Sequence, residues 1–374
     1  MQPKKAPTAV VAGHICLDIT PAFPKACGDQ SLFTPGTLMQ VGAADVHPGG
    51  CVANTGLALT LFGVPTRLIA CVGEDAFASL LQNMLASLGA QDVQLYTDAR
   101  LSTSYSIVLA PPGADRMFLH NPGANAAFTE AHLPDRLLAG ARLLHFGYPP
   151  LMPGMYARCG AALQALFRRA KALGLSTSMD MAAIDPGSEA ARVDWPHLLA
   201  KVLPVTDFFL PSAEELCMML EPARYADWQS RAIGGDVLAG LDIEADVAPL
   251  ADTLLAMGCK VAVVKCGSRG ILYRSGNHQA LQGTPLIMDV AGWSELRGFI
   301  PAFIPSHVVS ATGAGDTSIA AFLASALEGK PLRDCVVRAA ATGACCVQTY
   351  DALSGLIPLD VLDARVQAGW PQRK

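Results

Sequence analysis

The feature that most constrains the fold of this chain is a repeated order of short apolar run, turn and helical pattern. Residues 67–72 form one apolar run, Asp75 can cap the next helix, and large apolar residues then recur with helical spacing as far as Leu88. The same order returns within residues 142–180 and 207–220. Strands that alternate with helices pair in parallel, so the sequence predicts an α/β protein whose mainly parallel sheet is covered by helices.

The length of the chain would allow one large domain or two ordinary ones. It has 374 residues, of which 51% are hydrophobic and 16% charged, and this balance favours one large core and argues against disorder. We find no internal repeat or interdomain linker, and therefore expect a single domain over residues 1–374. The net charge of -5 shows no basic footprint for nucleic acid or a membrane surface.

The cysteines and the N-terminus indicate a compartment. The 11 cysteines are scattered without a C-x-x-C pair, and the adjacent Cys345 and Cys346 have poor geometry for an ordinary disulfide. The first residues, MQPKKAPTAVVAG, contain no apolar run long enough for a signal peptide, and no stretch is typical of a membrane span. We expect a cytoplasmic protein with reduced thiols.

Two regions break the alternating order. Residues 20–46 are rich in proline, glycine and threonine, with 38–41 as a possible short strand, and residues 103–109 and 117–120 flank a turn that contains Pro-Pro-Gly. We expect segments at about 14–46 and 100–121 to form a small sheet that stands off the main one as a lid. The polar segment 221–246 has no clear period and is predicted to be a variable surface excursion.

The strongest chemical signal lies within residues 308–328, which read VVSATGAGDTSIAAFLASALE. A loop of small residues opens a helix there, so bare backbone N–H groups at the positive end of the helix can hold an anion. Asp316 would repel a phosphate at that place unless it takes a proton from the group that attacks the phosphate. The alternative, that Asp316 only caps the helix, is left open by the local pattern.

A second group of residues is suited to sugar hydroxyls. Asp18 supplies a carboxylate and Asn54 an amide, and Gly49 and Gly50 allow close approach of the backbone. The same residues also fit a capping asparagine and turn glycines, which the pattern alone favours. The sequence lacks a G-x-x-x-x-G-K-[ST] loop, an H-E-x-x-H pair, zinc-ligand spacing and a G-x-S-x-G elbow.

Taken together, these stretches resemble the ribokinase-like (PfkB) family of carbohydrate kinases. SATGAGDTSIAAF is similar to the family's D-T-x-G-A-G-D signature, and GGCVANTGLALTLFG followed by VGEDAF is similar to its N-terminal signature. GHICLD, NPGANAAF, PSAEE at the place of the family's N-x-x-E, and KCGSRG support the likeness. The matching pieces lie in order from about residue 9 to 358, so the resemblance covers nearly the whole chain.

This resemblance implies a three-layer αβα domain with a lid, and transfer of the γ-phosphate of ATP, with Mg²⁺ bound to the phosphates, to a hydroxyl of a small carbohydrate. Lids of the family often pair between subunits, so we expect a homodimer. The implied roles are a general base (Asp316), an anion hole (Gly313, Ala314 and Gly315), sugar binding (Asp18, Gly49, Gly50 and Asn54), nucleotide binding (Lys265, Gly267, Ser268 and Gly270), and a Mg²⁺ contact through water (Glu215).

Three residues depart from the family's pattern. Ser310 replaces the first Asp of the signature, which in many members helps to bind a monovalent cation, and this departure argues against potassium activation. Ser212 replaces the Asn of N-x-x-E. Lys265 stands where many relatives have a small or hydroxyl residue, and we hypothesise that its ammonium supplies charge to the phosphates.

Other functions stay open at this stage. A nucleoside kinase of the same fold would need aromatic rings at the lid, for which the candidates are Phe23, Phe33, Tyr105 and Phe118. A sugar- or nucleotide-binding protein without turnover would not need Asp316 in an anion site. A phosphosugar substrate would need extra basic residues, and only Arg100 and Arg116 lie near the lid, so we expect an unphosphorylated sugar.

Overall fold

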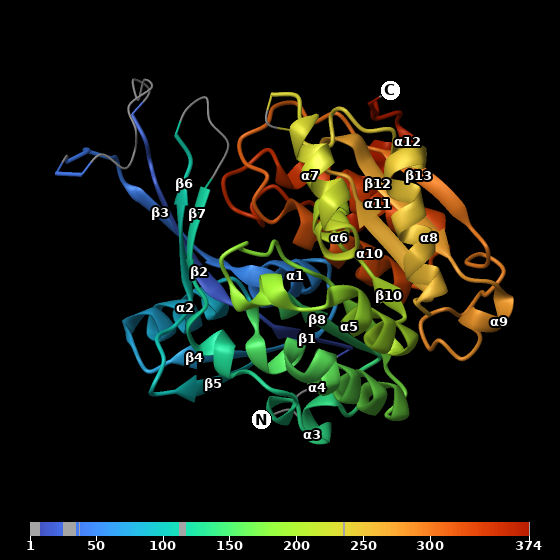
Figure 1. Ribbon diagram of the computed structural model, residues 1–374, viewed down its shortest axis with the longest axis horizontal. Coiled ribbons are helices and arrows are strands. Elements are labelled where there is room, and N and C mark those ends of the chain that lie inside the picture. Colours follow the sequence, from blue (N-terminus) through green and yellow to red (C-terminus); the bar gives the residue numbers. More distant parts are fainter. Residues whose placement is uncertain (1–7, 25–34, 37, 112–116, 235, 374) are drawn as a thin grey trace.

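The computed structural model of the protein describes residues 8–24, 35–36, 38–111, 117–234 and 236–373. It contains a large sheet between two helical layers and a small sheet that stands out from one side (Figure 1). The large sheet has nine strands in the order β13-β12-β11-β10-β9-β8-β1-β4-β5. All neighbours pair in parallel except β11 with β12 and β12 with β13. The predicted three-layer α/β architecture with a mainly parallel sheet is confirmed.

The central strands are short apolar runs because both of their faces are covered. In β1, Val10 and Ala12 point to one core and Ala9 and Val11 to the other. The strands of the large sheet are β1 (Ala9–Gly13), β4 (Thr66–Gly73), β5 (Asp92–Asp98), β8 (Leu143–Gly147), β9 (Ser176–Met179), β10 (Phe208–Phe209), β11 (Val261–Lys265), β12 (Gly270–Ser275) and β13 (Arg297–Pro301).

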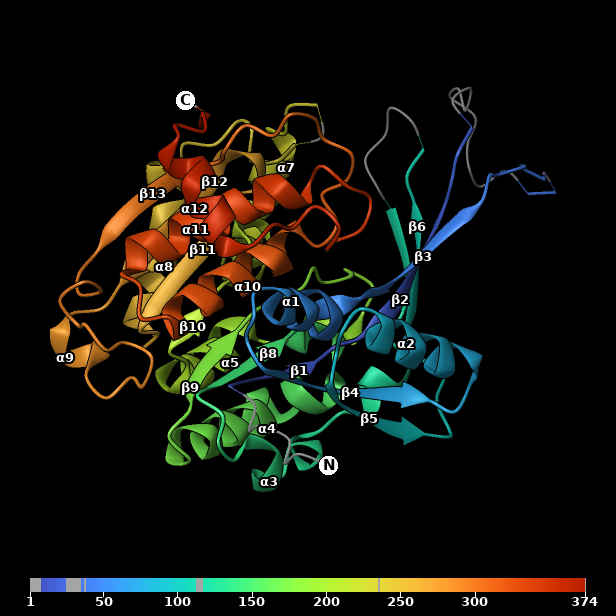
Figure 2. The same ribbon diagram turned by 180° about the vertical axis from the view of Figure 1, so that it is seen from behind.

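Each face of the sheet carries its own set of helices. One face, seen in front in Figure 2, packs on α1 (Gly50–Leu61), α2 (Ala76–Ser87), α10 (Ala314–Leu327), α11 (Leu332–Cys346) and α12 (Leu359–Gln367). The other packs on α4 (Pro153–Ala172), α5 (Trp195–Val202), α6 (Ala213–Leu220), α7 (Pro222–Ser230) and α8 (Ala248–Ala256). The short helices α3 (Asp135–Leu138) and α9 (His278–Leu281) complete the α-helices of the described residues. None of the described helices is long and apolar enough to cross a membrane.

The predicted small sheet is also confirmed, although one of its strands lies elsewhere than expected. It runs in the order β3-β2-β6-β7, with β2 (Cys16–Pro21), β3 (Ala44–Gly49), β6 (Tyr105–Leu109) and β7 (Met117–Asn121). The prediction of a strand at 38–41 was wrong, since Leu38 is 87% exposed and has no pairing strand within the described residues. Residues 44–49 pair with β2 instead, so Gly49 is the last residue of a strand and Gly50 the first of α1.

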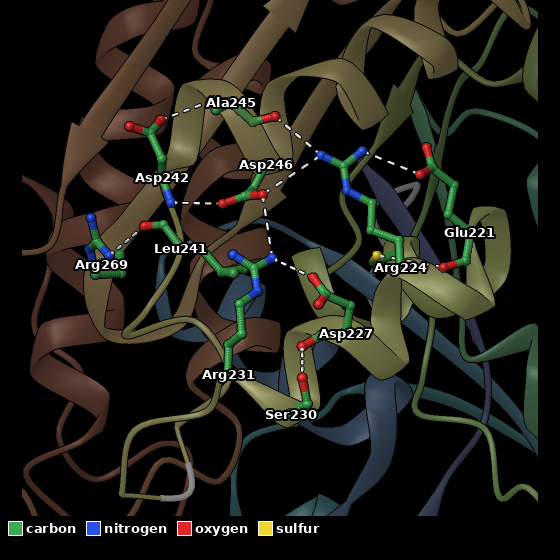
Figure 3. A network of polar contacts seen from close by, with 11 residues as sticks. Glu221, Arg224, Asp227, Ser230, Arg231, Leu241, Asp242, Ala245, Asp246 and Arg269 are labelled. Carbon is green, nitrogen blue, oxygen red and sulfur yellow. Dashed lines mark hydrogen bonds and ion pairs between the residues drawn. The ribbon is translucent and has the colours of Figure 1, made fainter.

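The segment 221–246 is more ordered than its sequence indicated. Its first part is α7, whose Trp228 is fully buried, so a single large residue anchors an otherwise polar helix. Arg224 and Arg231 form ion pairs there, both with Asp246 and each with an acid of its own, as Figure 3 shows. The sequence predicted a polar surface excursion but not the helix within it, because one buried tryptophan and a few charge pairs leave no helical period in the sequence.

Candidate active site

The N-terminal ends of α1 and α10 meet beside the carboxyl ends of the central strands. Gly313 precedes α10 with φ 72°, a left-handed conformation that suits glycine. A Cβ atom on Gly313 would also lie 2.2 Å from the Cβ of Ala352, so a side chain has no room. From α1, the hydroxyl of Thr55 donates a hydrogen bond of 3.2 Å to the carbonyl of Asp316. The loop before α10 thus has a fixed place against α1.

Asp316 lies in the first turn of α10 with only 3% of its surface exposed. The amide of Asn54 donates to its Oδ2 at 2.9 Å. The hydroxyl of Tyr148 lies 2.9 Å from Oδ1 and 2.8 Å from Oδ2, so its proton is shared by both oxygens. The hydrogen bonds of this carboxylate therefore come from α1 and from the residue after β8, and do not mark it as a cap of its own helix.

Burial raises the pKa of Asp316 above the ordinary value of an aspartate. The hydrogen bond from Asn54, the charge of Lys265 and the hydrogen bond from Tyr148 act in the opposite direction and favour the ionised form. A carboxylate whose pKa is raised by burial accepts a proton more readily than an exposed carboxylate with the ordinary pKa. Asp316 is therefore suited to be a general base.

A cavity of about 420 Å³ opens beside Asp316. Its walls come from the loop before α10, the turn between β11 and β12, the first turn of α6 and part of α11. The structure thus brings most of the sequence-predicted residues to one place, and those that line the cavity are Glu215, Lys265, Gly267, Ser268, Gly270, Gly313, Ala314, Gly315 and Asp316.

Lys265 is the buried cation of this cavity. Its Nζ lies 2.8 Å from Oδ1 of Asp180, and the two side chains are 15% and 2% exposed. Burial alone would lower the pKa of Lys265, but the charges of Asp180, Glu215 and Asp316 raise it above its ordinary value, so the ammonium stays charged. A Cβ on Gly315 would lie 3.5 Å from this Nζ, which places the charge directly against the small-residue loop.

Glu215 and Ser212 form a capping box at the start of α6. The backbone N–H of Glu215 donates to Oγ of Ser212 at 3.2 Å, and the N–H of Ser212 donates to Oε2 of Glu215 at 2.8 Å. Ser212 is therefore a functional helix cap despite its departure from the family's Asn. The capping box holds the Glu215 carboxylate at the cavity wall, while no cluster of three or more metal-ligating side chains occurs in the part of the chain that the structure describes.

The four residues predicted to bind sugar gather at the junction of β2, β3 and α1. Asp18 is half-buried, and burial raises its pKa. A Cβ on Gly49 would lie 2.2 Å from Oδ2 of Asp18, and a Cβ on Gly50 would lie 2.6 Å from Nδ1 of His14, so both positions require glycine. These residues lie outside the walls of the 420 Å³ cavity, and Asn54 is their hydrogen-bonded link to Asp316.

Two site residues that were not predicted from the sequence are Tyr148 and Asp180. Both directly follow strands of the parallel sheet, and side chains at the carboxyl ends of such strands face the ligand crevice of α/β proteins. Their position directly after predicted strands could have identified both as candidate site residues. Of the residues considered for other substrates, Arg100 forms a surface ion pair of 2.7 Å with Asp98, and Arg116 and Phe33 lie outside the described residues.

Comparisons with known proteins give a family through one family model and the fold through solved structures. A family model described as pfkB family carbohydrate kinase matches residues 9–358. Fructokinase-2 of Zea mays is 24% identical over 332 residues, which cover 86% of this chain and 85% of that protein. A structure of Arabidopsis thaliana ribokinase complexed with ribose and ATP superposes with a TM-score of 0.68 at 21% identity, and covers 96% of this chain and 98% of that one. A putative ribokinase II from E. coli in complex with ATP and Mg²⁺ has a TM-score of 0.66 at 20% identity, with 97% and 99% covered.

Proposed function

The chain belongs to the pfkB family of carbohydrate kinases, and from this premise we propose that it transfers the γ-phosphate of ATP to a hydroxyl of a small, unphosphorylated sugar. Enzymes of this family are phosphotransferases with an alcohol group as acceptor. The observation that carries the proposal is the position of the buried carboxylate of Asp316. On one side of it lies the cavity lined by the glycine loop and Lys265, and on the other lie Asn54 and Asp18.

In the proposed reaction, the acceptor hydroxyl binds beside Asp18 and Asn54 with its proton toward Asp316. As the hydroxyl oxygen forms its bond to the γ-phosphorus, the proton passes to the Asp316 carboxylate and the bond from phosphorus to the bridging oxygen of ADP breaks. The N–H groups of Gly313, Ala314 and Gly315 stabilise negative charge on the transferred phosphoryl group. One such donor contributes about 10²–10³-fold in other enzymes.

The nucleotide is proposed to lie in the 420 Å³ cavity, along Gly267, Ser268 and Gly270. Lys265 would then face the phosphates, because its ammonium lies against the Gly315 loop. Gly267 and Gly270 have φ values of 51° and 137°, which suit glycine, so the turn between β11 and β12 presents backbone without side chains to the cavity.

A magnesium ion fits the donors present if it is held mostly by the nucleotide. Mg²⁺ keeps several waters and is bound by one or two carboxylates together with substrate phosphates. The Glu215 carboxylate would contact the ion through a water, and its hydrogen bonds with Ser212 would hold it at the cavity wall. When bound, the ion would neutralise charge on the phosphates. Because Ser310 replaces the acid that helps to bind a monovalent cation in many relatives, we expect the enzyme to be active without added potassium.

We also propose a homodimer through the small sheet. Its strand β7 exposes Met117, Phe118 and Leu119 by 39–49%, and Leu38 and Met39 before β3 are exposed as well. Exposed apolar side chains on a small sheet and on the segment beside it are typical of an interface. Light scattering of the wild type and of Phe118→Asp tests this: a dimer that becomes a monomer supports the interface, and a wild-type monomer excludes it.

Transfer of radiolabelled phosphate from ATP and Mg²⁺ to a panel of sugars and nucleosides tests the function itself. We expect transfer to one or a few unphosphorylated sugars. Transfer to nucleosides alone would show that the protein is a nucleoside kinase of the same fold. Tight binding of a sugar without any transfer would identify it as a binding protein and exclude catalysis.

A further inference from the structure

The carboxylate of Asp316 is held by a tyrosine. The hydroxyl of Tyr148 lies within 2.9 Å of both carboxylate oxygens. This contact joins residues 168 positions apart in the sequence, so only the fold brings them together. A hydrogen bond to an ionised partner is shorter and stronger than one between neutral groups, so the contact can fix the orientation of the carboxylate.

The backbone at Tyr148 is strained, which is unusual for a bulky residue. Its φ of 64° and ψ of 41° lie in the left-handed region. The preceding Gly147 has no space for a side chain, since a Cβ there would lie 2.0 Å from Sγ of Cys51. Two prolines follow, and they restrict the next two φ angles. Such strain persists only where the surroundings fix it, and it gathers at functional sites.

A second contact connects the tyrosine to the small sheet. The ring of Tyr148 stacks on that of His14, with centroids 5.7 Å apart and planes at 30°. Nε2 of His14 lies 3.3 Å from Nε2 of His120 on β7, and Nδ1 of His120 lies 3.0 Å from the hydroxyl of Ser106 on β6. Burial lowers the pKa of both histidines, so both rings are neutral near pH 7 and can share one proton as donor and acceptor.

We propose that Tyr148 is the positioning residue of the general base, and that the His14–His120 contact connects this hold to the small sheet. The inference rests on the proposed role of Asp316. Tyr148 does not carry the reacting proton. It donates its own proton to the carboxylate throughout, which fixes the plane of the two oxygens and leaves a lone pair of Oδ1 for the acceptor hydroxyl, since Asn54 occupies only Oδ2.

Other charged groups around Asp316 bear on any pH dependence. The cation is Lys265 from β11, which favours the ionised base. The acids disfavour it; they are Asp18 from β2, Asp180 directly after β9, and Glu215 from α6. The nearby thiols are Cys16 from β2, Cys51 from α1 and Cys346 from α11. Tyr148→Phe removes a stabilising donor and leaves all of these in place. The acid limb of the rate profile must therefore move to higher pH.

The test is the pH profile of kcat/KM for Tyr148→Phe, with Tyr156→Phe as the matched control. Tyr156 packs on Trp195 in the opposite core layer and is not one of the residues that line the cavity. We expect Tyr148→Phe to lower kcat roughly 10-fold to 100-fold, as for loss of a hydrogen bond to a charged group, with little change in the KM of ATP. Tyr156→Phe should leave kcat and the acid limb unchanged. His120→Ala should move the limb in the same direction as Tyr148→Phe, by less.

A readout without turnover keeps this inference separate from the proposed function. Burial holds the phenol pKa of Tyr148 above its usual range, and the charge and the hydrogen bond of Asp316 add to this effect. With ¹³Cζ-labelled tyrosine, one of the seven tyrosine signals should resist alkaline titration, vanish in Tyr148→Phe, and titrate earlier in Asp316→Asn. An unaltered acid limb in Tyr148→Phe, or a Tyr148 signal indifferent to Asp316→Asn, overturns the inference. Absence of transfer in the wild type would overturn the proposed function alone.

Discussion

Two charged networks of this protein pair a basic side chain with an aspartate in different surroundings. At the cavity, Lys265 pairs with Asp180 at 2.8 Å, and the side chains are 15% and 2% exposed. On the surface beside α7, Arg231 pairs with Asp227 at 2.9 Å, and the side chains are 42% and 59% exposed (Figure 3). The distances are nearly equal. The exposed pair is worth about 0–1 kcal/mol, whereas removing one partner of a buried pair costs about 3–5 kcal/mol.

The pair at the ends of the strands is buried and the pair beside α7 is exposed, so burial distinguishes the site from the surface. A buried charge needs compensation, so the protein keeps it only where its field is used or where a partner neutralises it. Lys265 has such a partner and also lies against the Gly315 loop. Arg224 and Arg231, whose side chains are 27% and 42% exposed, hold a surface helix to the segment that contains Asp246.

The largest effect is expected from Asp316→Asn, which removes the proposed base while the new amide can still accept from Asn54 and Tyr148. Transfer should fall by roughly 10²–10⁴-fold, because a positioned base contributes about that much. The measurement is the rate of ADP release with saturating sugar and ATP. A variant as active as the wild type would show that Asp316 is not the base.

Next in size is Lys265→Met, which removes the buried cation and leaves Asp180 unpaired. We expect the free energy of unfolding to fall by about 3–5 kcal/mol and the KM of ATP to rise. The double variant Lys265→Met with Asp180→Asn should regain most of the stability, since no unpaired charge stays buried, but should keep the raised KM. If the KM of ATP is unchanged in the stable double variant, Lys265 does not serve the phosphates.

A smaller effect concerns stability against pH. Burial raises the pKa of Asp316 in the folded state above that in the unfolded chain, so the folded state binds the extra proton. This group then contributes stability below its unfolded pKa and loses it as the pH rises through the folded pKa. Asp316→Asn should therefore have a higher melting temperature than the wild type at pH 8, with a difference that shrinks toward pH 4. A difference that grows on acidification would mean that the pKa of Asp316 is lowered by folding.

The central sheet was predictable because its strands are buried on both faces and so appear as continuous apolar runs, such as 9–12 and 261–265. The strand at 44–49 was not, because its polar and proline-containing sequence takes its order from pairing with β2. The half-buried edge strand β5 and the antiparallel strand β13 were missed for a similar reason, since partial burial leaves a weak pattern.

The candidate acids and glycines of the site lie at the ends of predicted strands and helices. They come close together in the fold because the carboxyl ends of parallel strands lie at the same edge of the sheet. The sequence could not place Tyr148 on Asp316. The strained turn that aims this ring depends on close packing of Gly147 against Cys51, which no local pattern encodes. The role of Asn54 as a partner of Asp316 was likewise hidden, since the contact joins α1 to α10.

The variant Arg269→Ala shows whether the segment that contains the surface ion pairs affects nucleotide binding. Arg269 follows Ser268 in the cavity turn, and its guanidinium donates to the carbonyls of Leu238, Ala239 and Leu241 at 3.2, 3.5 and 3.0 Å. Arg269→Ala frees the turn, so the KM of ATP should rise roughly twofold to tenfold, as for loss of one or two net hydrogen bonds. The KM of the sugar should not change. Equal changes in both constants would point to general loosening instead.

The smallest effect is expected from Arg231→Ala, which breaks the exposed pairs with Asp227 and Asp246. Water already screens these charges, so the free energy of unfolding in urea should fall by less than about 1 kcal/mol, and less still at high salt. Activity and the KM of ATP should match the wild type, because Trp228 and the contacts of Arg269 still hold the segment in place. A fall in kcat comparable to that of Lys265→Met would remove the distinction between the two networks, and would show that the ion pairs beside α7 belong to the site.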